Sequence, residues 1–336
     1  MERFENWQYF TFNDLSPNVS KPNRDAVFNI HYKRDYRPKK NLDYFQALFR
    51  NAELIKDIYG GPFDVLFSGG IDSEIIIRTF HELGINQNVY TFRFENNINC
   101  YDVEHAIKTC DIMGIKHNII DFPLKKFLEN DAVSLYQISY PSTVEKLVRL
   151  KFYDYLDNIP VVGDGEPYWH RDLFNDFSKK SKWSLFSIEH DYANSIHAKA
   201  INRTIIGEWF LFTPEIAQTY IKIPHVKNLL QDKVPGKLSN WTYRCELHRT
   251  LWPDIIEKIK CTGYDGSNKR PNRPKFMSEF QAKYMQEKEK GFKLSKKDVE
   301  NWFNPNYTLD IDGDKFFEKF DKIQSAYWGY FDNTDD

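Results

Sequence analysis

Two periodicities of apolar and polar residues, one typical of strands and one of helices, alternate along the first half of the chain. Four short segments rich in apolar and β-branched residues are typical of strands, and they cover residues 64–67, 88–94, 116–122 and 159–163. Between them, apolar residues recur every three or four positions, which predicts helices over 73–84, 101–114, 123–130 and 142–157. Strands and helices that alternate at this spacing form right-handed βαβ units. The pattern therefore predicts an α/β fold with a Rossmann-like, doubly wound parallel sheet.

The flanking segments extend this pattern. Residues 26–32 are typical of a strand, and residues 41–60 predict a helix with Asn41 as its N-cap. We expect a fifth strand of the sheet at 203–212, and beyond residue 213 the pattern is helical. The expected parts are an N-terminal extension over 1–60, a central α/β domain over 61–266 and a helical C-terminal extension over 267–336.

The loop after the first predicted strand is the main candidate for chemistry. It reads SGGIDS over residues 68–73 and opens the first predicted helix, so the backbone N–H groups of Gly69 and Gly70 could point at an anion. Ser68 and Ser73 add hydroxyl donors. Asp72 would repel an anion unless a cation lies between them, which indicates a phosphate bound with Mg²⁺. The loop is neither a Walker A motif nor a dinucleotide fingerprint, and a capped Gly-Gly turn is the structural alternative.

A second loop follows the predicted strand at 159–163 and reads GDGE over residues 163–166. In a doubly wound sheet, ligands bind beyond the carboxyl ends of the strands where the winding reverses, so we expect this loop to lie against residues 68–73. Its two glycines allow close approach to a ligand, and either Asp164 or Glu166 could share Mg²⁺ with Asp72. A solvated acidic turn is the alternative.

The segment FSGGIDS resembles the PP-loop of the N-type ATP pyrophosphatases, the family that includes asparagine synthetase, NAD synthetase and tRNA-modifying enzymes. Other segments are similar, in family order, to the synthetase domain of asparagine synthetase. They lie between residues 63 and 266 and read YTFRFENN, YDVEHAIKTCDIMGIKHNIIDF, YPSTVEKLVRLKFYDYL, VVGDGEPYW and YRCELHRTLWPDIIEKIKCTGYDG.

The resemblance implies an adenine nucleotide alpha hydrolase-like fold, with ATP and Mg²⁺ as cofactors and a reaction that adenylates an acceptor and releases pyrophosphate. The implied nucleotide-binding residues are Ser68, Gly69, Gly70, Asp72, Ser73, Phe92, Gly163 and Asp164. The implied metal ligands are Asp72, Asp164 and Glu166, and the implied catalytic residues are Asp72 and Lys260. Because the spacing from Pro253 differs by one residue from that in the family, Lys258 is an alternative to Lys260.

The chain departs from the family pattern in its second loop and at its N-terminus. Val162 replaces the serine before the first glycine, and Pro167-Tyr168-Trp169 replaces the expected acids, so the surroundings of the acceptor are expected to differ. Residue 2 is Glu rather than the nucleophilic cysteine of a glutaminase domain, and about 60 residues before the loop are too few for such a domain. For an amidation, nitrogen would come from ammonia, an amine substrate or a partner protein.

Three functions follow from these patterns. The first is an ATP-dependent, asparagine synthetase-like ligase that adenylates a carboxylate and then forms an amide. The second is a PP-loop enzyme that modifies a nucleobase or tRNA, with the basic stretch at 269–275 as a local contact for nucleic acid. The third is an ATP-binding protein of the same fold without turnover. Thiolating relatives need reactive cysteines, and Cys100 and Cys110 are more typical of small buried residues.

The composition of the chain limits its expected partners and its cellular compartment. A formal net charge of −2 over 336 residues gives no overall attraction to a polyanion. The four cysteines have no zinc-binding or disulfide spacing, which is typical of a reducing compartment. No apolar run is long enough for a membrane span, so we expect a cytoplasmic protein without a membrane partner. The sequence leaves the oligomeric state open.

Overall fold

The computed structural model describes most of the central region and short pieces of both ends. The described residues are 8–12, 28–32, 37–95, 99–139, 144–164, 168–171, 183–186, 193–220, 222–224, 241–256, 295–297, 300 and 328–329. The predicted lysines at 258 and 260 and the second half of the GDGE loop lie outside these residues.

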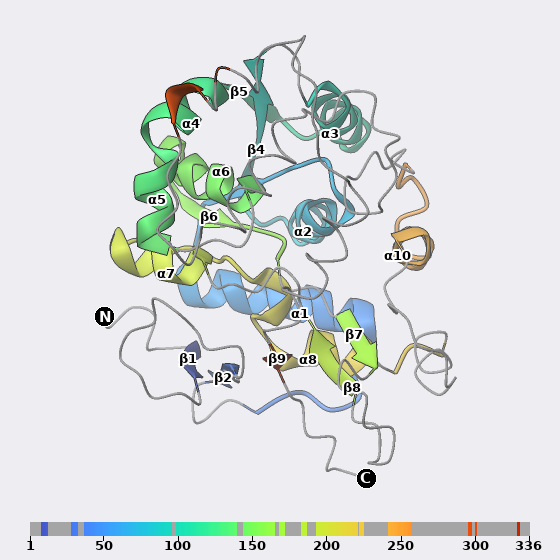
Figure 1. Ribbon diagram of the computed structural model, residues 1–336. Coiled ribbons are helices and arrows are strands. Elements are labelled where there is room, and N and C mark those ends of the chain that lie inside the picture. The colour runs from blue at the N-terminus through green and yellow to red at the C-terminus, as the bar shows by residue number, and fades with distance from the viewer. Residues whose placement is uncertain are drawn as a thin grey trace.

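A four-stranded parallel sheet forms the centre of the molecule (Figure 1). Its order is β5-β4-β3-β6, from β3 (Phe63–Leu66), β4 (Gln87–Phe94), β5 (His117–Phe122) and β6 (Ile159–Val161). The chain runs outward from β3 through β4 to β5 and then returns to the other side of β3 for β6. The winding therefore reverses between β3 and β6, which confirms the predicted doubly wound α/β sheet.

Helices cover both faces of the sheet because successive strand residues point to opposite sides. Val65 of β3 and Val89 of β4 belong to one buried cluster, whereas their neighbours Leu66 and Tyr90 contact the other. The helices that contribute to the first cluster are α1 (Tyr44–Tyr59), α2 (Ile71–Glu82), α3 (Cys100–Met113), α8 (Pro214–Tyr220) and α10 (Trp241–Arg249). Those that contribute to the second are α4 (Leu124–Asn130), α5 (Ala132–Ser139), α6 (Val144–Phe152) and α7 (Ala193–Ala200).

Two details of the predicted elements are wrong. Asp43 rather than Asn41 caps α1, because the Asp43 carboxylate accepts the N–H of Gln46 at 2.8 Å and the Gln46 side chain accepts the N–H of Asp43 at 3.0 Å. The segment 203–212 makes isolated bridges to the β6 edge instead of a strand, and it continues into the 3-10 helix η3 (Trp209–Leu211). This turn lets the rings of residues 209 and 210 enter the core beside α1.

The N-terminal helix is part of the same body as the sheet, since α1 contributes to the first buried cluster. A hairpin, β1 (Gln8–Phe12) with β2 (Phe28–Tyr32), contains the strand predicted at 26–32. A further antiparallel sheet, which the sequence did not predict, joins β7 (Tyr168–Arg171), β8 (Trp183–Phe186) and β9 (Trp328–Gly329). Within the described ranges, no helix combines the length and apolar character needed to cross a membrane.

A buried carboxylate fastens the entry edge of the sheet. Asp64 of β3 is fully buried and accepts hydrogen bonds from the Asn88 side chain at 2.8 Å, from the Asn158 N–H at 2.8 Å and from the Asn158 side chain at 2.9 Å. Asn88 belongs to β4, and Asn158 immediately precedes β6. One carboxylate therefore holds β3 in register with both neighbours.

We expect Asp64→Asn to destabilise the protein by roughly 1–3 kcal/mol, because an amide supplies one acceptor oxygen where the three donors need two. The free energy of unfolding in urea measures this change. Asp57→Asn on the exposed side of α1 is the matched control and should stay within about 0.5 kcal/mol of the original protein. Equal stability of the two variants would contradict the role given to Asp64.

Candidate functional site

The candidate phosphate loop, residues 68–73 (hereafter the phosphate loop), follows β3 and runs directly into α2. Gly69 has φ +70°, in the left-handed region that favours glycine, and Gly70 returns to extended backbone as the N-cap of α2. Among the described side chains, none caps this helix. The Ser73 hydroxyl donates to the Gly70 carbonyl at 3.1 Å and lies 3.5 Å from the Ser68 hydroxyl. The loop thus presents the start of a helix at the carboxyl end of the central strand, where an anion is favoured.

The second loop lies against the first, as predicted. Gly163 follows β6, and a Cβ atom built on it would come within 2.9 Å of the main-chain carbon of Asp72 and of the Ser73 nitrogen. Because no real Cβ tolerates such distances, a glycine is required for this close approach of two backbones. The two glycine loops therefore meet at the switch point between β3 and β6.

Asp164 lies in a polar cluster behind this contact. Its side chain is 6% exposed and forms an ion pair with Arg149 of α6, whose side chain is 23% exposed. The Asn194 amide donates to the same carboxylate at 3.2 Å, and the Tyr153 hydroxyl donates to the Asn194 oxygen at 2.7 Å. Burial raises the pKa of Tyr153 well above its usual value, so this hydroxyl keeps its proton and remains a donor.

The fit to Mg²⁺ depends on few protein ligands. Among the described residues, no three His, Cys, Asp or Glu side chains are grouped so that they could hold a metal ion. Asp72 stands at the phosphate loop, Asp164 is ion-paired with Arg149, and Glu166 is outside the described residues. Mg²⁺ in nucleotide sites is commonly held by one or two carboxylates together with phosphate oxygens and waters. The donor set fits an ion that arrives with a nucleotide and does not fit a preformed cage.

The ring of Phe92 belongs to the core. It is buried in the second cluster, with its centroid 4.3 Å from that of Phe122 and 3.5 Å from that of Phe152. A contact between β4 and an adenine at this position would therefore come from the main chain, and the contact itself stays a prediction.

A buried hydrogen-bond chain supports the start of the phosphate loop. The Thr91 hydroxyl donates to the Phe67 carbonyl at 2.5 Å and lies 2.8 Å from Nε2 of His117. Since the only hydroxyl proton of Thr91 is used for Phe67, Nε2 of His117 must carry the proton in this pair. Burial lowers the pKa of His117, which favours the neutral ring.

The cysteines give no sign of thiol chemistry in the described part of the chain. Cys110 is fully buried on α3, and burial raises its pKa to about 12, so it stays protonated at neutral pH. Cys100, Cys110 and Cys245 are free thiols. The expectation of small buried cysteines is confirmed for Cys110.

Several residues of the site have no motif in the sequence. Arg149 and Asn194 stand in ordinary helical segments, and only the fold brings them to Asp164. Glu74 and Arg78 have the i, i+4 spacing of a helix ion pair, a signal that most often marks an exposed pair. Here both are buried behind the phosphate loop.

Comparison with known proteins gives partial matches. No model of a known protein family matches the chain. The chain is similar to a 7-cyano-7-deazaguanine synthase from Methanocaldococcus jannaschii, with 31% identity over 61 residues. The match covers 18% of this chain and 26% of that protein, so the chain spans well under half of the relative's length.

Similar solved structures have low identity. A predicted subunit of a tRNA methyltransferase from Methanocaldococcus jannaschii is 18% identical, with 59% of this chain and 93% of that chain covered and a TM-score of 0.29. An NH3-dependent NAD synthetase from Campylobacter jejuni is 15% identical, with 64% and 100% covered and a TM-score of 0.30. An NMN synthetase from Francisella tularensis is 17% identical, with 81% and 100% covered and a TM-score of 0.28. At this similarity, the solved structures do not establish a function for the chain.

We expect Gly163→Ala to distort the phosphate loop, because its methyl group would press on the main chain of Asp72 and Ser73. Binding of inorganic pyrophosphate, measured by calorimetry, should weaken by about tenfold or more. Gly84→Ala at the other end of α2 is the matched control: its φ of +59° makes it costly to stability, but nothing lies within 4 Å of the new Cβ. The contact would be unimportant for binding if both variants bound pyrophosphate equally well.

Proposed function

We propose that the protein is a Mg·ATP-dependent enzyme that adenylates an acceptor and releases pyrophosphate. The finer proposal is an asparagine synthetase-like ligase that adenylates a carboxylate and then forms an amide with ammonia or an amine. The observation that carries the broader proposal is the close contact of Gly163 with Asp72 and Ser73, which joins two glycine loops at the switch point of a doubly wound sheet. A nucleotide bound at this point has its phosphates at the start of α2.

In this proposal the residues of the phosphate loop act by position and charge. The N–H groups of Gly69 and Gly70 and the Ser68 hydroxyl bind the β- and γ-phosphates, and the Ser73 hydroxyl joins them by turning away from the Gly70 carbonyl. This leaves the α-phosphorus open to the acceptor oxygen. Asp72 is the metal ligand beside them, with Asp164 or Glu166 as a second ligand. Bound Mg²⁺ supplies charge neutralisation on the phosphate oxygens. Lys260, or Lys258 in its place, stabilises the negative charge that develops as pyrophosphate leaves.

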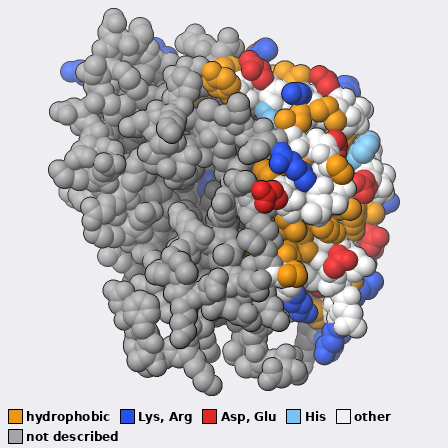
Figure 2. Space-filling view, turned by 90° about the vertical axis from the view of Figure 1, so that its right-hand side faces the viewer, with side chains coloured by type: hydrophobic (Ala, Val, Ile, Leu, Met, Phe, Trp, Pro, Cys, Tyr) orange, Lys and Arg blue, Asp and Glu red, His pale blue; other side chains and the backbone are white. Residues whose placement is uncertain are grey.

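A second candidate is an enzyme of the same type that adenylates a nucleobase carbonyl. The match to a protein named as a 7-cyano-7-deazaguanine synthase supports it. The pairing of Arg149 with Asp164 supports it as well, because an acceptor carboxylate could use this arginine only by competing with the ion pair of a buried aspartate. A neutral carbonyl meets no such cost. Figure 2 shows acidic and basic side chains interspersed over the described part of one face, and the basic stretch at 269–275 lies outside the described residues.

The proposed reaction is tested by ATP labelled at the α-phosphate, incubated with Mg²⁺ and panels of carboxylates and nucleobases in the presence of ammonia. We expect labelled AMP and unlabelled pyrophosphate to form with one class of acceptor. A carboxylate acceptor supports the ligase, and a nucleobase supports the second candidate. ATP binding without AMP from any acceptor would leave an ATP-binding protein without turnover, and a chain that binds no ATP would contradict the proposal.

The roles of the two aspartates can be separated. We expect Asp72→Asn to lower AMP formation by about 10²-fold or more and to raise the Mg²⁺ concentration needed for half-maximal rate. Asp164→Asn should chiefly lower stability, by roughly 1–3 kcal/mol, because the ion pair with Arg149 loses its negative charge. Asp57→Asn is the control for the removal of a carboxylate. An equal rise in the Mg²⁺ requirement in both site variants would mean that Asp164 is a metal ligand of the same importance.

A further inference from the structure

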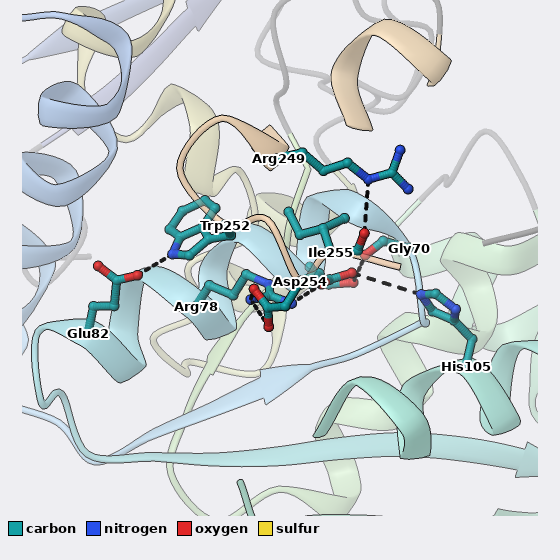
Figure 3. A network of polar contacts seen from close by, with 10 residues as sticks. Gly70, Arg78, Glu82, His105, Arg249, Trp252, Asp254 and Ile255 are labelled. Carbon is teal, nitrogen blue, oxygen red and sulfur yellow. Dashed lines mark hydrogen bonds and ion pairs between the residues drawn. The ribbon is translucent and has the colours of Figure 1, made fainter. Parts of the chain in front are cut away.

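A buried ion pair lies one turn inside the phosphate-loop helix (Figure 3). Glu74 and Arg78 of α2 have side chains that are 1% and 4% exposed. Nε and Nη2 of Arg78 both lie 2.8 Å from Oε1 of Glu74. An ion pair that is exposed at this spacing contributes little, but one that is removed from water is screened much less by salt.

Two other segments join this pair. Nη1 of Arg78 donates to both carboxylate oxygens of Asp254 at 2.9 Å, across 176 residues of sequence. Nε2 of His105 on α3 lies 3.9 Å from Oε2 of Glu74. The side chain of Asp254 is 47% exposed, so its charge is largely compensated by solvent, whereas that of Glu74 depends on protein partners.

The segment 251–256 is fastened to α2 at a second point. The Trp252 indole donates to the Glu82 carboxylate at the end of α2, and Nε of Arg249 donates to the Ile255 carbonyl at 2.9 Å, which stiffens the turn that carries Asp254 (Figure 3). Arg78 is thus held between a fixed carboxylate on α2 and a fixed carboxylate on this segment.

The position of Glu74 creates an electrostatic problem for the loop. Both Asp72 and Glu74 belong to the first turn of α2, the end of a helix at which an anion binds. A buried negative charge there repels a pyrophosphate, and little water is available to weaken the repulsion. The guanidinium of Arg78, in direct contact with Glu74, cancels that charge at its source.

We propose that Arg78 is a positioning residue for the anion site: by neutralising Glu74 it keeps the phosphate loop receptive to a pyrophosphate group. Arg78 is too deeply buried to contact the ligand itself and acts through Glu74. The inference rests on the proposed function for the nature of the anion. It goes beyond that function, because it assigns the affinity of the loop to a charge balance behind it.

The alternative is that the Glu74–Arg78 pair only holds α2 in place. Variants that remove one charge of the pair, or both together, separate the two roles. The variants are Arg78→Met, Glu74→Gln and the double variant Arg78→Met/Glu74→Gln. Affinity for inorganic pyrophosphate is measured by calorimetry, and thermal unfolding reports the stability of each variant. Arg50→Met, which removes an arginine of α1 beside Glu53, is the control for loss of one positive charge.

We expect Arg78→Met to bind pyrophosphate about tenfold more weakly and Glu74→Gln to bind it at least as tightly as the original protein. The double variant should regain affinity to within about threefold, although it has lost the ion pair and is less stable. A folded double variant that binds as weakly as Arg78→Met would overturn the proposal, and so would an Arg78→Met variant with unchanged affinity.

The outcome is independent of turnover. If the original protein binds pyrophosphate and the variants behave as expected, but no acceptor yields AMP, the proposed function fails and the charge balance stands. If AMP forms and the affinity of Arg78→Met is unchanged, the proposed function stands and the charge balance fails. If the original protein binds no pyrophosphate, the charge balance is wrong, and AMP formation alone decides the proposed function.

Discussion

The candidate site depends on one steric constraint, the approach of the Gly163 backbone to the backbone of Asp72 and Ser73. It is possible because β6 pairs with β3 on the side opposite β4, so the loops after β3 and β6 leave the sheet at the same edge. A side chain at position 163 would separate them. The sheet order brings the loops together, the glycine sets how closely they approach, and Asp64 at the opposite edge keeps the three strands in register.

The parts of the fold that sequence predicts well are those with strong periodicity. The four parallel strands and the helices α2, α3, α4 and α6 were predicted within about five residues, because each has an apolar pattern of suitable length, whereas α5 between β5 and β6 was not predicted. The prediction of a fifth strand at 203–212 was wrong because this apolar run has the composition of a strand. Only its packing against α1 shows that the aromatic residues enter the core through a turn. The cap of α1 was misplaced by two residues because Asn41 and Asp43 are both good capping residues, and the reciprocal bond with Gln46 decides between them.

In the candidate site too, features that are local in sequence were predicted and long-range contacts were not. The glycine loops are local in sequence, so the motif and the strand before it were enough to predict that the loop at 163–166 lies against residues 68–73, and the contact of Gly163 confirms this for its first residue. The partners of the acidic residues were not predictable, since Arg149, Asn194 and Asp254 come from distant segments and have no distinctive neighbours. Long-range pairing is decided by which helix faces which loop, and one sequence carries no direct signal of that. Phe92 illustrates the opposite case, because an aromatic residue on a central strand fits a ligand contact and a core position equally well in sequence, and the structure buries its ring.

The polar groups around the loop share a common arrangement. Asp164 and Glu74 are both buried carboxylates near the carboxyl edge of the sheet, and each is held by an arginine, Arg149 or Arg78. An isolated buried negative charge is costly and repels an anionic ligand, and in each pair the arginine offsets that charge. The two pairs differ in exposure: Arg78 is sealed between α2 and residue 254, whereas Arg149 is partly open to solvent. Arg149 is therefore the more accessible of the two arginines, whereas the pair at Glu74 is a buried, fixed part of the start of α2.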